Sequence, residues 1–318
     1  MSAVEADAVT ETDDQLEAAL DGLAQGLAHA VRSPILRTPA ECGLAFEDVS
    51  FPSTDGTPLE AWFIPCEGSE KLIVFEHPMM FNRYGFAAHV EPWRSAFGEG
   101  YGNDVEVSFI PNYRILHDAG YNVLTFDFRN FGLSGAANGG LMSGNRFEVR
   151  DVLGALAYVR SRPELAAMTV GIFAGCMGAN ATFRAIHTEP AAFEGVRCLV
   201  APLLLSPMAF VERALENLGV STEHAGEVER RTRLLTSCSL SEGSPVAWAP
   251  SVTMPTLTYG VREDALVAPD DLEAAYAAIG ADDKSMFWIE GTRARWDGYL
   301  YFQRHPETVL ARLADHMG

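Results

Sequence analysis

Basic residues are scarce in this chain, and long apolar runs are missing from it. The 318 residues include 23 Lys and Arg against 43 Asp and Glu, a formal net charge of −20 at pH 7. A protein that binds nucleic acid or an anionic bilayer through its overall charge needs the opposite balance, because that affinity comes from neutralising phosphates. No run of about 18 apolar residues suggests a transmembrane helix. We therefore expect neither a nucleic-acid partner nor a membrane.

Cysteine is also sparse, and its spacing argues against cross-links. The five cysteines stand far apart and no Cys-x-x-Cys pair occurs, which excludes a typical disulfide framework or zinc ribbon. Neither a P-loop nor a dinucleotide-binding G-x-G-x-x-G motif is present, so no metal and no cofactor are indicated. The acidic N-terminus lacks the basic and apolar segments of a signal peptide. A reducing cytoplasm is the compartment we expect.

Apolar residues are abundant, at 48% of the chain, and can bury a sizeable core. Residues 1–14 suggest a disordered acidic tail, and 15–44 an N-terminal helical extension that docks on the body. From there a predicted β-hairpin is followed by repeated strand–helix units, which is typical of a mostly parallel sheet with helices on both faces. We expect an α/β fold of about eight strands, with its core in 45–205 and 253–318 and a helical cap insertion in 206–252.

A strand-to-helix junction is the most informative feature. The predicted buried strand MTVGIFA runs into Ala174-Gly175-Cys176-Met177-Gly178, and a helix follows at once. Small residues suit a sharp turn here, because larger side chains would collide with the neighbouring strand and helix. Such a turn holds Cys176 at a helix N-terminus, where the dipole and free N–H groups favour a thiolate. The N–H of Met177 is then placed to donate to an oxyanion. The alternative for Cys176 is a small apolar residue in a tight turn.

This junction resembles the nucleophile elbow of the α/β-hydrolase superfamily, G-x-S-x-G, with cysteine in place of serine and Ala174 in place of the first glycine. Three other segments resemble superfamily motifs in the same order: EHP at 76–78, FDFRNFGLSG at 126–135 and YGVREDALVAP at 259–269. Cysteine at the elbow also resembles dienelactone hydrolases and polyhydroxyalkanoate synthases. The resemblance covers about residues 45–318 and implies the α/β-hydrolase fold and acyl-transfer chemistry.

The resemblance implies an acid and a histidine after the nucleophile. Asp264, which follows the seventh strand of the fold, matches the acid position, and Glu263 competes with it. His305 is the first histidine after the eighth strand. It either swings back to the elbow, if residues 291–304 form a loop, or lies on the surface at the start of the last helix. The segment that usually carries the histidine holds instead Arg293, Ala294 and Arg295.

The same resemblance implies a second oxyanion donor from the loop after the third strand. Pro78 has no N–H, so Met79 is the expected donor. His77 is usually structural in the superfamily, but it is kept as a candidate for substrate binding. Further candidates, whose alternatives are core packing for the tryptophan and surface solubility for the arginines, are Trp248, Arg83, Arg293 and Arg295.

Three functions stay open. The leading hypothesis is that Cys176 forms a thioester with a small ester, lactone or thioester, and that Asp264 and His305 support its hydrolysis. A thiol is partly ionised without a base, whereas attacking water needs one. An unplaced histidine therefore also fits an acyltransferase or condensing enzyme with another acceptor. The third possibility is a non-catalytic binding protein that kept the fold. The expected partner is a small acyl substrate, and a homo-oligomer is left open.

Overall fold

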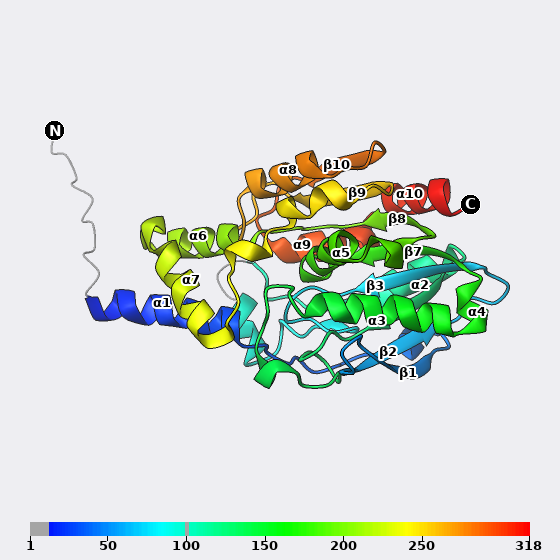
Figure 1. Cartoon of the computed structure of the whole chain (residues 1–318), viewed down its shortest axis with the longest axis horizontal. Coiled ribbons are helices and arrows are strands. Elements are labelled where there is room, and N and C mark those ends of the chain that lie inside the picture. The colour runs from blue at the N-terminus through cyan, green and yellow to red at the C-terminus, as the bar shows by residue number, and fades with distance from the viewer. Residues whose placement is uncertain (1–12, 99–101) are drawn as a thin grey trace.

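A central sheet of eight strands organises the chain (Figure 1). The computed structural model describes residues 13–98 and 102–318. The first two strands form an antiparallel hairpin, and the second pairs antiparallel with the sixth; all other neighbours are parallel. The sheet order is β1-β2-β6-β3-β7-β8-β9-β10. The predicted hairpin and mostly parallel sheet are confirmed. The strands are β1 (Glu47–Pro52), β2 (Pro58–Ile64), β3 (Lys71–Glu76), β6 (Asn122–Phe126), β7 (Thr169–Ala174), β8 (Val196–Val200), β9 (Thr256–Val261) and β10 (Lys284–Ile289).

Helices cover both faces of this sheet, and the strands feed a separate apolar core on each. Along β3, Leu72 and Val74 join one core while Ile73 and Phe75 join the other, because successive strand side chains point to opposite faces. The first core is completed by α3 (Glu148–Ser161), α5 (Met177–Thr188) and α8 (Pro269–Ala278). The second is completed by α2 (Ile110–Asp118), α9 (Arg295–Arg304) and α10 (Glu307–Met317). A short pair, β4 (Gly85–Phe86) and β5 (Val107–Ser108), forms a separate ribbon.

A third apolar cluster joins the N-terminal helix to residues 206–252, which lie between β8 and β9 and are called the inserted segment below. Helix α1 (Asp13–Ala28) lies against α7 (Ala225–Thr236), with α6 (Pro207–Asn217) beside them at the same end of the molecule (Figure 1). Leu20 of α1 and Val228 of α7 are buried in this cluster. Arg231 pairs with Glu17 at 2.7 Å and with Asp21 at 2.6 Å. The N-terminal helix thus packs on the inserted segment. Residues 1–12 of the predicted acidic tail fall outside the described residues.

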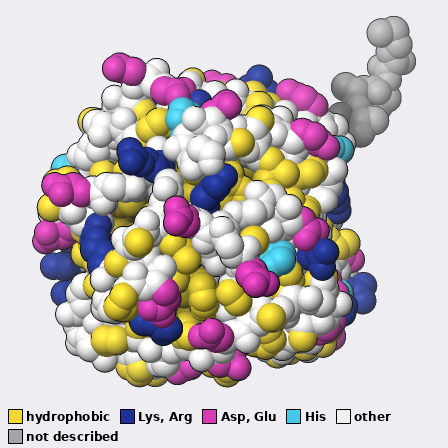
Figure 2. All heavy atoms as spheres, turned by 90° about the vertical axis from the view of Figure 1, so that its right-hand side faces the viewer, with side chains coloured by type: hydrophobic (Ala, Val, Ile, Leu, Met, Phe, Trp, Pro, Cys, Tyr) yellow, Lys and Arg dark blue, Asp and Glu magenta, His cyan; other side chains and the backbone are white. Residues whose placement is uncertain are grey.

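The surface at the opposite end carries mixed charge. Around α4 (Pro163–Ala166) and the end of α10, acidic and basic side chains are interspersed, with no broad area of one sign (Figure 2). Among the described residues, no helix is both long and apolar enough to cross a membrane.

The carboxyl group of Glu76 is buried and has no ionic partner among the described residues. Glu76, the last residue of β3, is 1% exposed, and its Oε2 accepts a hydrogen bond from the Thr182 hydroxyl at 2.6 Å. Burial raises the pKa of Glu76 to about 8, although the hydrogen bond from Thr182 opposes the shift. The group is therefore mostly protonated at neutral pH.

This burial predicts a pH-dependent stability. Between the ordinary pKa of 4.5 and the raised value of about 8, the folded protein holds a proton that the unfolded chain has lost, so stability falls as the pH rises through this window. Glu76→Gln cannot ionise and still accepts from Thr182. In urea unfolding, the free energy of unfolding of Glu76→Gln minus that of wild type should increase by roughly 2–4 kcal/mol when the pH is raised from 5 to 8. The exposed control Glu70→Gln should show no such gain, and an equal effect at both pH values would contradict the account.

Candidate active site

A strained turn presents Cys176 at the start of α5. Its backbone has φ 52° and ψ −112°, a conformation that costs energy for a residue with a side chain and persists only when the surroundings enforce it. The Cys176 N–H donates to the carbonyl of Pro202 at 3.0 Å, which ties the turn to the loop after β8. A Cβ on Gly178 would lie 2.9 Å from the Cβ of Glu76 and 3.1 Å from the carbonyl oxygen of His77. Only glycine lets the helix approach β3 this closely.

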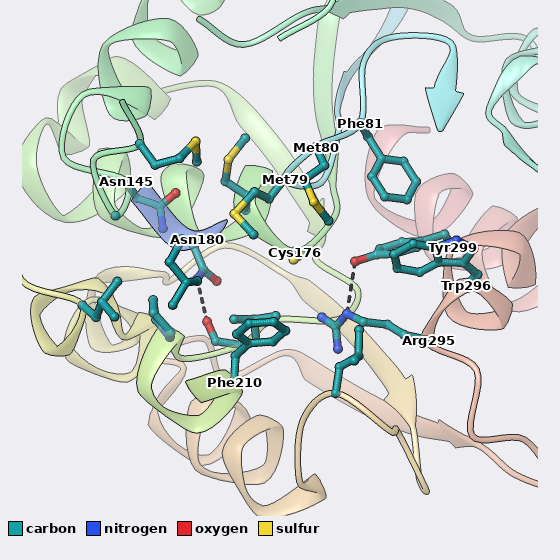
Figure 3. A pocket seen from close by; sticks show the side chains of 18 residues that line it. Met79, Met80, Phe81, Asn145, Cys176, Asn180, Phe210, Arg295, Trp296 and Tyr299 are labelled. Carbon is teal, nitrogen blue, oxygen red and sulfur yellow. Dashed lines mark hydrogen bonds between the residues drawn. The ribbon is translucent and has the colours of Figure 1, made fainter. Parts of the chain in front are cut away.

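Cys176 lines a cavity of about 100 Å³. A single water needs about 10–15 Å³ on the same scale, so the cavity suits a ligand of roughly seven to ten non-hydrogen atoms. Helix α1 contributes Leu27, and the inserted segment contributes Phe210 and Leu240, so the N-terminal helix belongs to the wall of the site. The other apolar lining residues are Met79, Met80, Phe81, Met142, Met177, Leu205, Pro207, Leu266 and Trp296 (Figure 3).

A chain of polar side chains runs from β9 to the thiol. The Asp264 carboxylate accepts a hydrogen bond from Nη1 of Arg295 at 2.5 Å, and the two side chains are 5% and 4% exposed. Arg295 also donates from Nη2 to the carbonyl of Leu203 and from Nε to the Tyr299 hydroxyl, the latter at 3.1 Å. The Tyr299 hydroxyl points into the cavity on the side of Cys176 (Figure 3), and Cys176 is one of the groups that raise its pKa. Arg295 thus comes from the segment after β10, where the resemblance implies a histidine.

The charges of these groups follow from burial and from their neighbours. Burial opposes the positive charge of Arg295, but interactions with Tyr299, Asp264 and Cys176 outweigh it and hold the pKa of Arg295 well above its usual value. Burial raises the pKa of Tyr299 well above its usual value; the neighbouring Cys176 reinforces this shift, and Arg295 opposes it. At neutral pH the arginine is therefore charged and the tyrosine is a neutral hydrogen-bond donor.

Of the two positions considered for His305, the structure contradicts the catalytic one at the elbow and shows the one on the surface. Residues 295–304 do not loop out; they form α9, a helix of 10 residues and hence about 15 Å long. Arg295 begins the helix at the cavity, whereas His305 lies beyond its far end, exposed and packed against the ring of Tyr301. None of the described residues that line the cavity is a histidine.

Four other candidates for substrate binding also lie elsewhere. His77 is buried, and its Nδ1 donates to the carbonyl of Pro78 at 2.7 Å while its Nε2 accepts from the N–H of Phe128 at 2.9 Å. Burial lowers the pKa of His77 to about 3, so the ring is a neutral structural link behind the site. Arg83 forms a buried ion pair with Asp127 at 2.5 Å and does not line the cavity.

The remaining two occupy a core and a surface position. Trp248 packs in the first apolar core, where the Arg184 guanidinium lies 5.0 Å from its ring centre. The Arg293 side chain is exposed. Of the three arginines considered, only Arg295 lines the cavity, and Asp264 holds its charge.

The two expected oxyanion donors stay candidates. Met79 and Met177 both line the cavity beside Cys176. Their backbone N–H groups donate no hydrogen bond within the described residues, as is required of donors that await a ligand oxygen.

Sequence reasoning missed three polar lining residues, namely Tyr299, Asn145 and Asn180. Asn180 stands four residues after Cys176, so the helical spacing alone placed both on one face. Tyr299 has the same spacing from Arg295, but this signal needed a helix over a segment taken for a loop. Nothing local in the sequence pointed to Asn145.

The strand order, the strained turn after β7 and the acid after β9 together define the α/β-hydrolase fold. An esterase from Pyrococcus furiosus shares it, with a TM-score of 0.68 and 19% identity over 92% of this chain and 98% of that chain. Dienelactone hydrolase from Anabaena variabilis gives a TM-score of 0.54 and 15% identity over 86% and 99% of the respective chains. A serine hydrolase without a lid from Xanthomonas campestris gives 0.51 and 14% over 85% and 94%. No family model and no curated protein matches the sequence.

Removing Arg295 should destabilise the protein, because Asp264 would be left as an unpaired buried charge. For Arg295→Met we expect a loss of about 3–5 kcal/mol in denaturant unfolding. The double variant Asp264→Asn, Arg295→Met should lose less than the sum of the single variants. Arg304→Met is a matched control on the same helix, since its pair with Asp297 is largely exposed, and should lose at most about 1 kcal/mol. Equal losses in Arg295→Met and the control would contradict a buried pair.

Proposed function

We propose that the protein is an acyl-transfer enzyme in which Cys176 attacks the carbonyl carbon of a small ester or thioester. One observation carries this proposal: the thiol on the strained turn lines a small apolar cavity together with a buried, charged guanidinium. A positive charge and a helix N-terminus are the surroundings in which cysteines act as nucleophiles. The fold shared with an esterase and a dienelactone hydrolase supports an ester as the substrate class.

The acylation step follows from the placement of the polar groups. As the sulfur attacks, the carbonyl oxygen takes up negative charge and accepts hydrogen bonds from the N–H groups of Met177 and Met79. The bond between the Cys176 sulfur and the carbonyl carbon forms, and the bond to the leaving atom breaks. This atom is oxygen in an ester and sulfur in a thioester, and the thiol proton must reach it. The Tyr299 hydroxyl can accept the thiol proton while it donates its own. Such a relay leaves Tyr299 neutral, so its raised pKa is no obstacle.

The second step distinguishes this site from a serine hydrolase. Water needs a general base to attack the thioester. Arg295 cannot serve, because a guanidinium stays protonated in proteins, and the raised pKa of Tyr299 makes tyrosinate rare. Hydrolysis should therefore be slow.

A second candidate function is acyl transfer to an amine or a thiol, favoured by the guanidinium that stands where a base is needed. These acceptors are stronger nucleophiles than water and depend less on a base. In both functions the same thioester on Cys176 is the intermediate.

The kinetics of p-nitrophenyl acetate cleavage test this function. We expect a burst of about one p-nitrophenol per protein, followed by slow turnover that added thiol or amine accelerates. Cys176→Ala should abolish the burst. Cys238→Ala should retain it, because Cys238 is buried away from the cavity lining. A burst that survives in Cys176→Ala would refute Cys176 as the nucleophile. Fast linear hydrolysis by wild type would refute the claim that the site lacks a general base for water.

The role of Tyr299 predicts a dependence on the leaving group. An alkoxide needs a proton as it departs, whereas p-nitrophenolate does not. Tyr299→Phe should therefore slow acylation by an alkyl acetate about 10²–10⁴-fold and affect p-nitrophenyl acetate much less. Tyr301→Phe is the matched control, since this residue of α9 packs on Phe287 and lies outside the cavity lining. Equal slowing of both esters by Tyr299→Phe would contradict proton donation from Tyr299 to the leaving group.

A further inference from the structure

Two asparagines bring unsatisfied polar atoms into the apolar cavity. Asn145 and Asn180 both line it (Figure 3) and are 5% and 2% exposed. The side-chain oxygen of each is buried and has no hydrogen-bond partner. Buried amide oxygens are rarely left without a donor, because an unpaired acceptor in an apolar setting costs free energy. An oxygen of this kind in the wall of a cavity calls for a ligand that donates to it.

The orientation of Asn180 is fixed by the protein. Its Nδ2 donates to the carbonyl of Leu205 at 2.7 Å, so its Oδ1 is the atom left for the cavity. The N–H of Asn180 also donates to the carbonyl of Cys176 at 2.9 Å, which places the residue one helical turn from the nucleophile. Four residues of helix rise by about 6 Å. The acceptor and the Cys176 thiol therefore belong to residues that line the same cavity one helical turn apart.

Asn145 adds a second polar group on the same wall. Its Oδ1 is buried and has no hydrogen-bond partner among the described residues, and its backbone is held at φ 67°. In Figure 3 both asparagines lie to one side of Cys176, with Arg295, Tyr299 and Trp296 on the other. The polar asparagine wall is thus separate from the groups to which the proposed function assigns the chemistry.

We infer that the acyl group taken up by Cys176 carries a neutral hydrogen-bond donor, a hydroxyl or an amide N–H, near its carbonyl, and that Asn180 and Asn145 select for it. This inference rests on the proposed function. An unsubstituted alkyl chain of the same size would leave the asparagine oxygens unpaired. Sites that hydrogen-bond a donor on their ligand strongly reject analogues that lack this donor.

The charge of the cavity restricts the donor to a neutral one. None of the described residues lining the cavity is acidic, and the nearby carboxylate of Asp264 is paired with Arg295. An ammonium group would therefore be desolvated without a counter-charge. A hydroxyl or an amide N–H meets the asparagine oxygens without this cost.

Matched p-nitrophenyl esters test the inference. 3-Hydroxybutanoate and 3-methylbutanoate differ by a hydroxyl in place of a methyl group, and N-acetylglycinate offers an amide N–H instead. We expect wild type to be acylated by at least one of the two donor-bearing esters at least about tenfold faster than by 3-methylbutanoate, compared as the burst rate constant divided by the half-saturating concentration. The faster of the two identifies the donor.

Variants assign the preference to the asparagine wall. The preference is the acylation efficiency with the faster donor-bearing ester divided by that with 3-methylbutanoate. Asn180→Leu should reduce this ratio to within about threefold of unity, and Asn145→Leu should also lower it. Asn112→Leu is the matched control: Asn112 is also buried with an unpaired Oδ1, but it does not line this cavity, and its ratio should equal that of wild type. An unchanged ratio in both Asn180→Leu and Asn145→Leu would overturn the role of the asparagines. Wild type that prefers 3-methylbutanoate, or shows no preference, would overturn the inference while a burst sustains the proposed function.

Binding to Cys176→Ala tests the same inference without catalysis. By calorimetry, methyl 3-hydroxybutanoate or methyl N-acetylglycinate should bind at least about tenfold more tightly than methyl 3-methylbutanoate. If no ester gives a burst but this difference is found, the proposed function fails and the inference about the ligand stands. If all three bind equally, the inference fails whatever the kinetics show.

Discussion

The buried ion pair between Asp264 and Arg295 is the interaction on which the site depends. It is tight and shielded from water, so neither charge is screened by solvent. The pair fixes the guanidinium, and the guanidinium in turn orients Tyr299 towards Cys176. In a serine triad, the acid orients an imidazole that can take up and release a proton. Here the acid orients a permanent cation, which cannot take up a proton and so cannot activate water.

The proposed cysteine nucleophile is consistent with an arginine in place of the imidazole. Serine would be inert beside an arginine because its hydroxyl needs a base, whereas a thiol needs mainly a setting that stabilises negative charge. Cys176 lies at the start of α5 and lines the same cavity as Arg295. In the proposed function, the elbow, the absent imidazole and the arginine form one arrangement, which favours formation of a thioester over its hydrolysis.

The parts of the fold that could be predicted from sequence were those set by local pattern. Alternation and apolar runs gave the hairpin and the parallel strands, and the small residues around Cys176 gave the turn. Helix α9 was missed because it has no amphipathic pattern: Tyr299, Leu300 and Phe302 are buried on several sides. Because this helix was not predicted, a position of His305 at the elbow stayed open beside the surface position that the structure shows.

Contacts between distant segments were the other feature that could not be predicted from the sequence. Arg83 and Arg295 look alike in sequence, yet one is paired with Asp127 away from the site and the other with Asp264 inside it. Which acid meets which arginine depends on how distant segments meet in space. The same holds for Leu27 and Asn145, which reach the cavity from segments far from Cys176 in the chain.

Identification of the modified residue tests the central claim most directly. After a brief reaction with p-nitrophenyl acetate and an acid quench, peptide mapping by mass spectrometry should find a single acetyl group on the peptide that contains Cys176. Neutral hydroxylamine should remove it, as expected of a thioester. Release of p-nitrophenol with Cys176 unmodified, or an acetyl group only on other residues, would contradict acyl transfer through this thiol.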